Sequence, residues 1–324
     1  MFLGLALAGS LLICSCGGNS ESTSGLESNS QSPVDFVDPR EVSILGYTGD
    51  AMEPSLSRDG VILFFNNLNS ESLVNGANND TNIHYATRID DVTFQYVGEV
   101  AGANIDEISD ANELEGVPSL DKNGKFYFIR TIDYLNPESS DYLLSIFQAD
   151  YVDGRLVNIQ SLPSLKHNRV NQEPVLGELN FDAEIHPDGE DLYFVEGIFS
   201  GGAVPDEADI GVASESDGIF KVDENSVEEM ALVNTVALEY APSISSNSLE
   251  LYFTRASGSI ESGYEFGIYV ATRNSVADSW SNISRIEAIS GEITEGPSIS
   301  LDGTLLYYHQ RKSGVFRIYV VTRN

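Results

Sequence analysis

Acidic side chains stand at the head of five similar segments of this chain, and their type and spacing suit them to chemistry. They are Glu53, Glu115, Asp182, Glu239 and Glu295. Each lies one to three positions before the proline of a repeated phrase, or before the alanine that replaces it. Carboxylate oxygens are hard ligands that suit Ca²⁺, and two carboxyl groups roughly 5–10 Å apart can hydrolyse a glycosidic bond. The acids could therefore form a cation site or a glycosidase pair.

Polar side chains also follow the second apolar run of each segment, and they would reach the same end of the molecule. They are Asn67, Arg130, Glu196, Arg255 and Gln310, with His309 and Arg311 beside them. The plainest interpretation is that the acids pair with arginines or are hydrated. The alternatives are a catalytic carboxylate pair and a site for a cation or another ligand. The candidates for that ligand site are Glu53, Glu115, Asp182, Glu239, Glu295, Arg130 and Arg255.

One phrase occurs five times, and a repeat of this kind decides the architecture before any single residue is interpreted. It occupies residues 53–60, 117–124, 182–189, 241–248 and 296–303. From Pro54 to Pro118, Ala183, Pro242 and Pro297 the spacings are 64, 65, 59 and 55 residues. In each copy a short apolar strand enters a turn, usually through Asp-Gly or Asn-Gly, which favour tight hairpins. An aromatic-rich strand follows.

Each unit continues with two more strands. The third strands are predicted at residues 83–88, 145–149, 218–222, 267–273 and 317–323. A weaker fourth strand closes each unit, as at residues 284–289. Four antiparallel strands repeated radially describe a β-propeller, so we predict an all-β propeller of five four-stranded blades. The aromatic pairs of the second strands, such as Tyr252-Phe253, are then core between blades, and a sixth blade within the second or third unit is the alternative count.

The ends of the repeat suggest how the ring closes. The fifth unit stops at Asn324, directly after its third strand. Residues 41–47 take the place that a fourth strand occupies before every other unit. We therefore expect this N-terminal strand to complete the last blade and close the ring, which removes two exposed sheet edges. The alternative is that it is only an additional strand.

The phrase Pro-Ser-(Ile/Leu)-Ser-x-Asp-Gly, an aromatic strand and an Ile-Tyr-Val strand together resemble the TolB-like β-propeller repeat. The resemblance extends over roughly residues 50–324. It implies the propeller fold, and it is unspecific for function. Relatives of this kind include periplasmic proteins that hold partner proteins, propeller domains attached to peptidases, and some lyases.

The N-terminal segment is apolar and small over residues 2–13, which is too short to span a membrane and has the length of a signal-peptide core. It leads to Ser15 and Cys16, a pair that resembles a bacterial lipobox. The resemblance implies cleavage before Cys16 and lipidation of its thiol. We expect a signal peptide over residues 1–15, a flexible polar tether over 16–40 and the propeller over 41–324. An ordinary signal peptide or a buried strand is the alternative.

Cell-envelope placement follows from this anchor. The expected location is the bacterial cell envelope, at the outer membrane and facing the periplasm or the exterior, with membrane contact only through the lipid. Both cysteines lie in the N-terminal segment, so the predicted propeller has no disulfide and no thiolate chemistry.

Charge excludes two classes of partner. The formal net charge is −33, from 50 acidic and 17 basic residues. A chain this acidic is repelled by nucleic acid and by anionic lipid, so neither is an expected partner. The charge suits a cationic partner or Ca²⁺, and it also suits a solvated surface that maintains solubility.

No sequence motif specifies a reaction. The four histidines fall in different units without the spacing of a metal motif, and no nucleophile elbow, phosphate loop or dinucleotide fingerprint occurs. We therefore predict a monomeric, non-catalytic module that binds a protein or a glycan through the channel face, where the inner strands begin. No cofactor is expected, with Ca²⁺ as the alternative. The competing function is an extracellular carbohydrate-active hydrolase or lyase that uses the carboxylates at the channel mouth.

Overall fold

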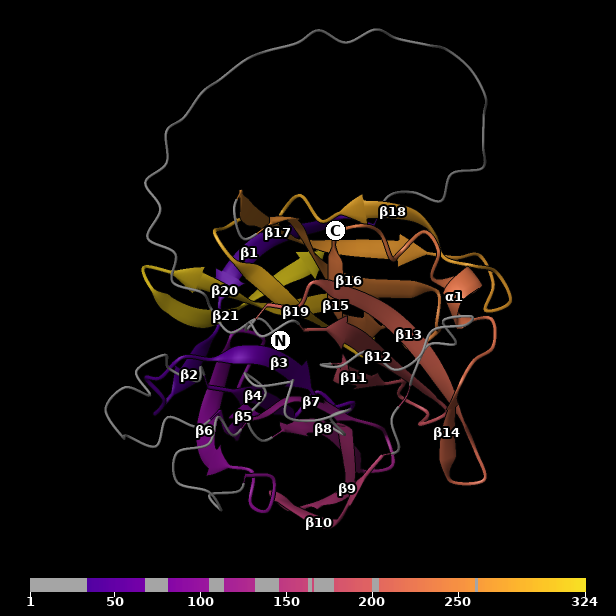
Figure 1. Ribbon diagram of the computed structural model, residues 1–324. Helices are drawn as coiled ribbons and strands as arrows, with labels where there is room; N and C mark the ends of the chain where they lie inside the picture. The colour runs from indigo at the N-terminus through magenta and orange to yellow at the C-terminus, as the bar shows by residue number, and fades with distance from the viewer. Residues whose placement is uncertain are drawn as a thin grey trace, which may run out of the picture.

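A computed structural model describes residues 34–67, 81–104, 114–131, 146–162, 165, 178–199, 204–259 and 262–324. Its sheets are arranged around a central axis, as Figure 1 shows. The prediction of an all-β propeller with five blades is confirmed. Apart from strands, these residues form a short helix, α1 (Ser226–Glu229).

The inner strands surround the axis, and each contacts the inner strands of both neighbouring blades. In blade order they are β3 (Met52–Leu56), β7 (Leu114–Leu120), β11 (Glu178–Ile185), β15 (Leu238–Ile244) and β19 (Thr294–Ile299). The second strands are β4 (Ile62–Asn66), β8 (Lys125–Thr131), β12 (Asp191–Ile198), β16 (Glu250–Ser259) and β20 (Leu305–Lys312). All of these pairs are antiparallel, as expected for strands joined by tight turns.

The outer half of each blade is built in the same order. The third strands are β5 (Ile83–Arg88), β9 (Ile146–Val152), β13 (Glu207–Ser216), β17 (Gly263–Thr272) and β21 (Val315–Arg323). The fourth strands are β6 (Thr93–Glu99), β10 (Arg155–Ser161), β14 (Ile219–Val222), β18 (Ser281–Arg285) and β1 (Phe36–Glu41). Two predicted strands need correction. Residues 218–222 belong to the fourth strand of blade 3 rather than its third, and the fourth strand of blade 4 ends at Arg285, before residues 286–289.

An N-terminal strand closes the ring as predicted, but the residues differ from the predicted ones. β1 pairs antiparallel with β21 and completes blade 5, whereas residues 41–47 were expected there. Within those residues β2 (Ser43–Leu45) pairs in parallel with β6 and gives blade 1 a fifth strand. Pro39 argues against a strand over residues 36–41 in the sequence, because proline has no backbone N–H to donate to a neighbouring strand. The strand accommodates it with an irregular register between Val37 and Arg40 at the edge of the sheet.

The hydrophobic core is divided into layers between neighbouring blades. Five clusters of buried residues correspond to the five blade interfaces. The aromatic pairs of the second strands lie in them, with Tyr252 and Phe253 both fully buried. Stacking of blades therefore buries the apolar faces that no blade could bury alone.

The repeated phrase is explained by its turn. Ser57 donates from Oγ to Asp59 over 2.6 Å and accepts the backbone N–H of Ile62 over 2.8 Å. The fourth copy departs from Asp-Gly, yet Ser245 donates in the same way to Asn247 over 2.8 Å. Side-chain acceptors thus replace lost backbone partners in the turn, which is why these residue types recur.

The serine of Pro-Ser joins neighbouring blades. Its hydroxyl accepts a backbone N–H from the inner strand of the adjacent blade, at 3.2, 3.0 and 3.1 Å for Leu56 to Ser298, Ile185 to Ser119 and Ile299 to Ser243. These three bonds connect the inner strands of blades 1 and 5, 2 and 3, and 4 and 5.

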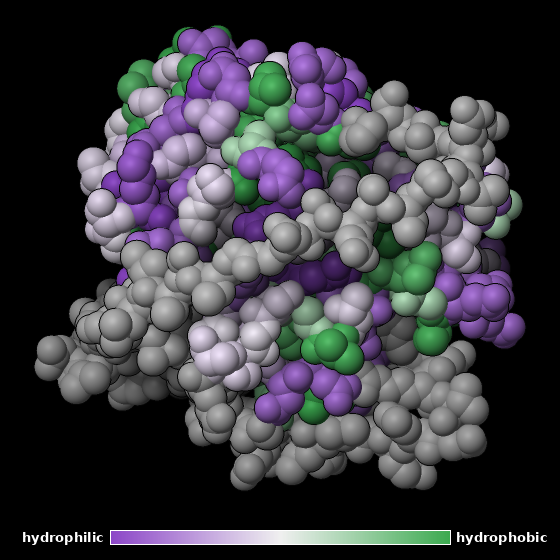
Figure 2. Space-filling model, turned by 90° about the horizontal axis from the view of Figure 1, so that it is seen from above, coloured by the Kyte–Doolittle hydropathy of each residue, from purple (hydrophilic) through white to green (hydrophobic). Residues whose placement is uncertain are grey.

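Hydrophilic side chains cover much of the molecular side seen in Figure 2, and hydrophobic ones gather there only in small groups. Such a surface matches the strongly acidic composition. None of the described residues forms a helix with the length and hydrophobicity that membrane crossing requires.

Candidate functional site

A bulge interrupts every inner strand at the same place in the phrase. The register with the second strand shifts there in all five blades. The residue before the proline, or before Ala183, has a left-handed backbone, with φ between 48° and 64° at Glu53, Val117, Asp182, Ala241 and Gly296. Residues other than glycine rarely adopt this conformation, and it is most strained for a β-branched one. The shared bulge therefore directs one position of each blade in the same way.

Because of the bulge, the five predicted acids lie at three levels along the axis. Glu53 and Asp182 are bulge residues themselves. Glu295 precedes the bulge residue of its blade by one position, and Glu115 and Glu239 precede theirs by two. The acids therefore do not form one ring of equivalent carboxylates.

The two acids farthest from the bulge form ion pairs. Glu115 and Glu239 lie directly opposite Arg130 and Arg255 across the first and second strands. The Nε–Oε1 distances are 3.6 Å and 2.5 Å, and both carboxylates are fully buried. The guanidinium of Arg255 also stacks 4.8 Å from the ring centre of Tyr269. These two acids thus pair with arginines, as the plainest interpretation of the sequence proposed. Each ion pair connects the inner strand of its blade to the second strand.

The other three acids meet near the axis in what we call the axial cluster, which comprises Glu53, Asp182, Tyr240, Glu295 and His309. His309 accepts the backbone N–H of Glu53 at Nδ1 over 3.1 Å, and its Nε2 lies 3.1 Å from Oε2 of Glu295. Since Nδ1 serves as an acceptor, the neutral ring carries its hydrogen on Nε2 and donates it to Glu295. Tyr240 donates its hydroxyl to the other oxygen of Glu295. Asp182 accepts a backbone N–H from blade 4 over 3.0 Å.

Burial and mutual repulsion govern the charges of this cluster. Burial raises the pKa of Glu53 to about 7, and the carboxylates of Asp182 and Glu295 add to this rise while His309 opposes it. Burial also raises the pKa of Asp182. The pKa of Tyr240 is raised well above its ordinary value, by burial and by the carboxylate of Glu295. The cluster thus carries fewer negative charges near neutral pH than its residue types suggest.

Glu53 is the member of the cluster with an incomplete set of partners. Its side chain is 3 % exposed, and Oε1 has no hydrogen-bond partner. The Nε2 atom of His309 lies 4.0 Å from this oxygen. A buried carboxylate oxygen without a donor is costly, and buried polar atoms of this kind call for an explanation.

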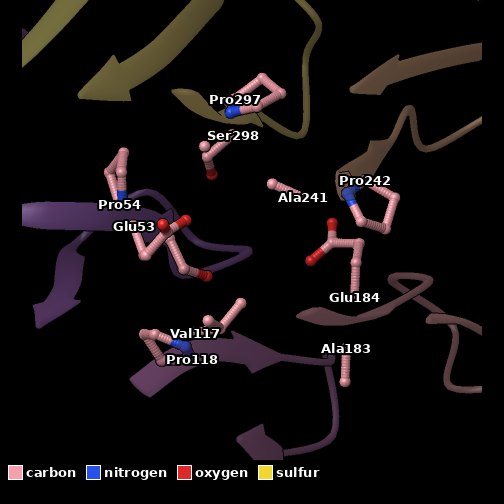
Figure 3. A pocket seen from close by; sticks show the side chains of 12 residues that line it. Glu53, Pro54, Val117, Pro118, Ala183, Glu184, Ala241, Pro242, Pro297 and Ser298 are labelled. Carbon is pink, nitrogen blue, oxygen red and sulfur yellow. The ribbon is translucent and has the colours of Figure 1, made fainter. Parts of the chain in front are cut away.

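Glu53 opens onto a cavity on the axis of about 30 Å³. Residues from all five inner strands line it, including four prolines and two serines of the repeated phrase. Figure 3 shows the carboxyl groups of Glu53 and Glu184 approaching its middle from opposite sides. The volume is sufficient for a water molecule or a group of similar size.

Glu184 is a residue that our sequence analysis missed. It stands where the other blades carry the serine of Pro-Ser, and this departure from the repeat was the available signal. Its carboxylate accepts the hydroxyl of Ser119 over 2.6 Å and the guanidinium of Arg58 over 3.2 Å. Arg58 also donates to the backbone oxygens of Leu120 and Ile185, at 2.8 and 2.6 Å. This ion pair therefore links blades 1, 2 and 3 beside the cavity.

Tyr240 and His309 complete the set of axial residues that the sequence did not assign. His309 was expected only beside the mouth, and no pattern indicated the hydroxyl of Tyr240. Among the described residues no group of three or more His, Cys, Asp or Glu side chains is arranged to hold a metal ion. The calcium alternative stays a prediction.

Gly296 tests how tightly the cluster is packed. A Cβ there would lie 2.7 Å from Oε2 of Glu53 and 2.8 Å from Nδ1 of His309, at a φ of 64°. Gly314 has a φ of 83°, and a Cβ built there has no atom within 4 Å. Gly314→Ala therefore measures the cost of backbone strain without any steric clash. We expect Gly314→Ala to cost about 1 kcal/mol and Gly296→Ala about 3 kcal/mol in chemical denaturation. Equal losses would contradict close packing at Glu53.

Comparisons with known proteins support the fold. No protein-family description and no curated protein matches the chain. Among solved structures, a glycoside hydrolase has a TM-score of 0.60 at 10% identity, covering 90% of this chain and 92% of its own. An endo-arabinase from Bacteroides thetaiotaomicron VPI-5482 has a TM-score of 0.50 at 13% identity, covering 88% and 97%. TolB from Acinetobacter baumannii has a TM-score of 0.43 at 13% identity, and the match covers 85% of this chain and 55% of TolB. At these identities the likeness concerns the propeller alone.

Proposed function

We propose that this protein is a non-catalytic binding module that engages a protein or glycan partner through the channel face of its propeller. The observation that supports this proposal is the axial cavity, where a buried oxygen of Glu53 has no hydrogen-bond partner. A partner that donates a hydrogen bond to this oxygen would remove the free-energy cost of burying it without a donor. The ion pairs Glu115–Arg130 and Glu239–Arg255 would frame this site without taking part in chemistry.

The size of the cavity favours recognition over hydrolysis. Sites that enclose small organic ligands have volumes of roughly 300–1,000 Å³, whereas the axial cavity measures about 30 Å³. A sugar ring would not enter the cavity bounded by these residues. A side chain or terminal group of a larger partner would enter it more readily.

A carbohydrate-active hydrolase is the second candidate. It is favoured by the pKa of Glu53, which burial raises to about 7, the range that a general acid needs near neutral pH. Two solved structures with a similar fold are named as a glycoside hydrolase and an endo-arabinase, and this likeness of fold supports the alternative. In this alternative Glu53 would protonate the leaving group and a second axial carboxylate would act on the sugar.

One set of proteins tests both candidates. The full chain, Glu53→Gln and the control Glu224→Gln, an exposed carboxylate, would be immobilised at equal density and exposed to envelope extract and to a glycan array. We expect a defined partner that the full chain and the control retain and that Glu53→Gln loses. The same proteins would be incubated with a polysaccharide panel. Release of reducing ends that depends on Glu53 would overturn the binding proposal and favour the hydrolase.

The location is proposed on sequence grounds, since Cys16 lies outside the described residues. A lipid on Cys16 would hold the propeller at the bacterial outer membrane on the tether that follows. Replacing Cys16 by alanine should move the protein from the membrane fraction to the soluble fraction, because one polar tether cannot itself bind a bilayer. Cys14→Ala should leave it in the membrane fraction. Identical fractionation of the two variants would argue against an anchor at Cys16.

A further inference from the structure

Two residues that depart from the repeated phrase meet at the turn face, which is the end of the propeller where the inner strands enter their turns. The third copy has His186 where the first, fourth and fifth copies have a serine, and the fourth copy has Ser248 where the other four have glycine. The strands of blades 3 and 4 lie side by side (Figure 1). Nε2 of His186 lies 3.0 Å from Oγ of Ser248. The two departures thus contact each other across a blade interface.

The turns themselves require neither residue. Ser57 and Ser300 each donate from Oγ to the aspartate two positions later over 2.6 Å, so a serine is sufficient at the position of His186. Ser248 has a φ of 59°, in the left-handed region that the glycines of the other copies adopt without strain. Residues that local structure does not explain are expected at functional sites.

The buried imidazole of His186 lies between a carboxylate and a hydroxyl. Its Nδ1 is 2.7 Å from Oδ1 of Asp188, whereas the backbone N–H of Asp188 is farther from the same nitrogen, at 3.4 Å. The shorter contact places a hydrogen on Nδ1, which the ring donates to the carboxylate. Nε2 is then the acceptor for the hydroxyl of Ser248. A nucleophile bound to a base that a third group orients is the arrangement that activates a serine.

The groups around this arrangement hold both of its ends. Burial would raise the pKa of Asp188, but hydrogen bonds from the backbone N–H of Glu190 and from His186 outweigh burial and lower that pKa. The ionised carboxylate keeps the imidazole in one tautomer and stabilises the imidazolium that forms when Nε2 takes a proton. At the other end, Nε of Arg273 donates to the backbone oxygen of Ser248 over 2.7 Å. This bond fixes the turn that carries the half-buried Ser248.

We propose that Ser248 is an acyl-acceptor site, a nucleophile that takes an acyl group from an ester, with His186 as its general base and Asp188 as the positioning residue. Oγ of Ser248 attacks the carbonyl carbon of the ester while its proton passes to Nε2 of His186. The bond from that carbon to the leaving oxygen then breaks, and the leaving oxygen takes the proton from His186. The products are an O-acyl serine and an alcohol. This site lies at the opposite end of the inner strands from the channel mouth, so the inference goes beyond the proposed function.

The local hydrogen bonds favour a single acyl transfer over repeated turnover. Fast turnover needs N–H groups aimed at the oxyanion of the tetrahedral intermediate. The N–H of Ser248 is donated to the oxygen of Ser245 over 2.9 Å, and that of Leu249 to Oδ1 of Asn247 over 3.0 Å. Because both N–H groups are engaged, we expect the O-acyl serine to form slowly and to persist. Such a site is a place of covalent modification and is compatible with a binding module.

The test uses p-nitrophenyl acetate as the probe, because it is an ester with a good and coloured leaving group. The full chain would be mixed with an excess of the probe at slightly alkaline pH. Absorbance would follow the release of p-nitrophenolate, and peptide mass spectrometry would locate the acetyl group. We expect a burst close to one equivalent per chain, with the acetyl group on Ser248.

Variants that restore the repeat separate the chemistry from folding. Ser248→Gly and His186→Ser introduce the residues of the other copies, so both should remain folded in thermal unfolding. Ser248→Gly should abolish the burst, and His186→Ser should slow it by about 10²-fold or more. Asp188→Asn should also slow it, and Asp188→Glu should recover part of the rate, which a purely structural role would not produce. Ser246→Ala, at an exposed residue of the same turn, should leave the rate unchanged.

Two results would overturn the proposal. One is acetylation of Ser248 at equal rates in the wild type and in His186→Ser, since the imidazole would then not act as a base. The other is an acetyl group found on lysines and not on Ser248. The probe needs no partner, so either result would leave binding at the channel face standing, and failure to retain a partner there would leave the acyl-acceptor site standing.

Discussion

Replacing Glu53 by glutamine is expected to stabilise the protein at about pH 8 by about 3 kcal/mol, or roughly 5–10 °C in Tm. Glu53 is 3 % exposed, and burial raises its pKa to about 7 from an ordinary value of 4.5. Folding therefore favours the protonated carboxyl. Its contribution is intact below about pH 4.5, falls as the pH rises toward 7, and is lost above that. Glutamine has the same shape and no charge, so the loss should not occur.

The pH dependence identifies the cause. At about pH 4.5 the wild type and Glu53→Gln should differ little, and the difference should grow up to about pH 7 and then remain constant. The groups that face Glu53 are Asp182, Glu295, His309 and Tyr240, and they are common to both proteins. Glu224→Gln controls for removing one charge from an acidic chain. A variant less stable than the wild type at about pH 8 would mean that ionised Glu53 is stabilised in the folded state.

The residue at each of the five bulges determines which kind of side chain the blade contributes near the axis. The bulge residues are Glu53, Val117, Asp182, Ala241 and Gly296. Their backbone conformation is the same, while their side chains are acidic, apolar or absent. Scaffold and axial chemistry are therefore separable, because the phrase after the bulge maintains turns and blade contacts whatever residue precedes it. This separation explains why the repeat predicts the fold much better than the function.

The sequence predicted what depends on the repeated phrase. Turns with Asp-Gly, inner strands and aromatic second strands follow from local residue types, and they recur in every blade. The third strand of blade 3 was misplaced because Glu207–Ser216 is rich in small and acidic residues that do not resemble a strand. Its neighbours in the sheet, rather than its own propensity, determine its conformation. Such tertiary effects are not contained in a local pattern.

The candidate site was predicted in part. The acids do approach the axis, but the bulge sets three of them in the axial cluster and two in ion pairs. A count of residues before the proline could not reveal this, since one extra residue in a strand changes which side chain faces a given side. Tyr240 and His309 come from strands of two different blades, so only the closed ring brings them together.

Replacing Phe36 by alanine is expected to cost about 3–5 kcal/mol and to lower the Tm by about 10 °C. The ring of Phe36 is 2 % exposed and lies edge to face with Tyr252 of blade 4, with centres 6.0 Å apart. It anchors β1, the strand that pairs with β21 and closes the propeller. The variant should lose packing between blades 4 and 5 and weaken the closing pair together.

Two control variants locate the closing strand by experiment. Val37→Ala alters the adjacent residue of β1, which is 40 % exposed, and Leu45→Ala alters the segment that the sequence suggested, at a residue 43 % exposed. Both should change the unfolding free energy by no more than about 0.5 kcal/mol. If Phe36→Ala were as mild as these controls, β1 would not carry the closure. Loss of closure should also expose the edge of β21, and unpaired edges invite association. Phe36→Ala should therefore aggregate at temperatures where both controls remain monodisperse in light scattering.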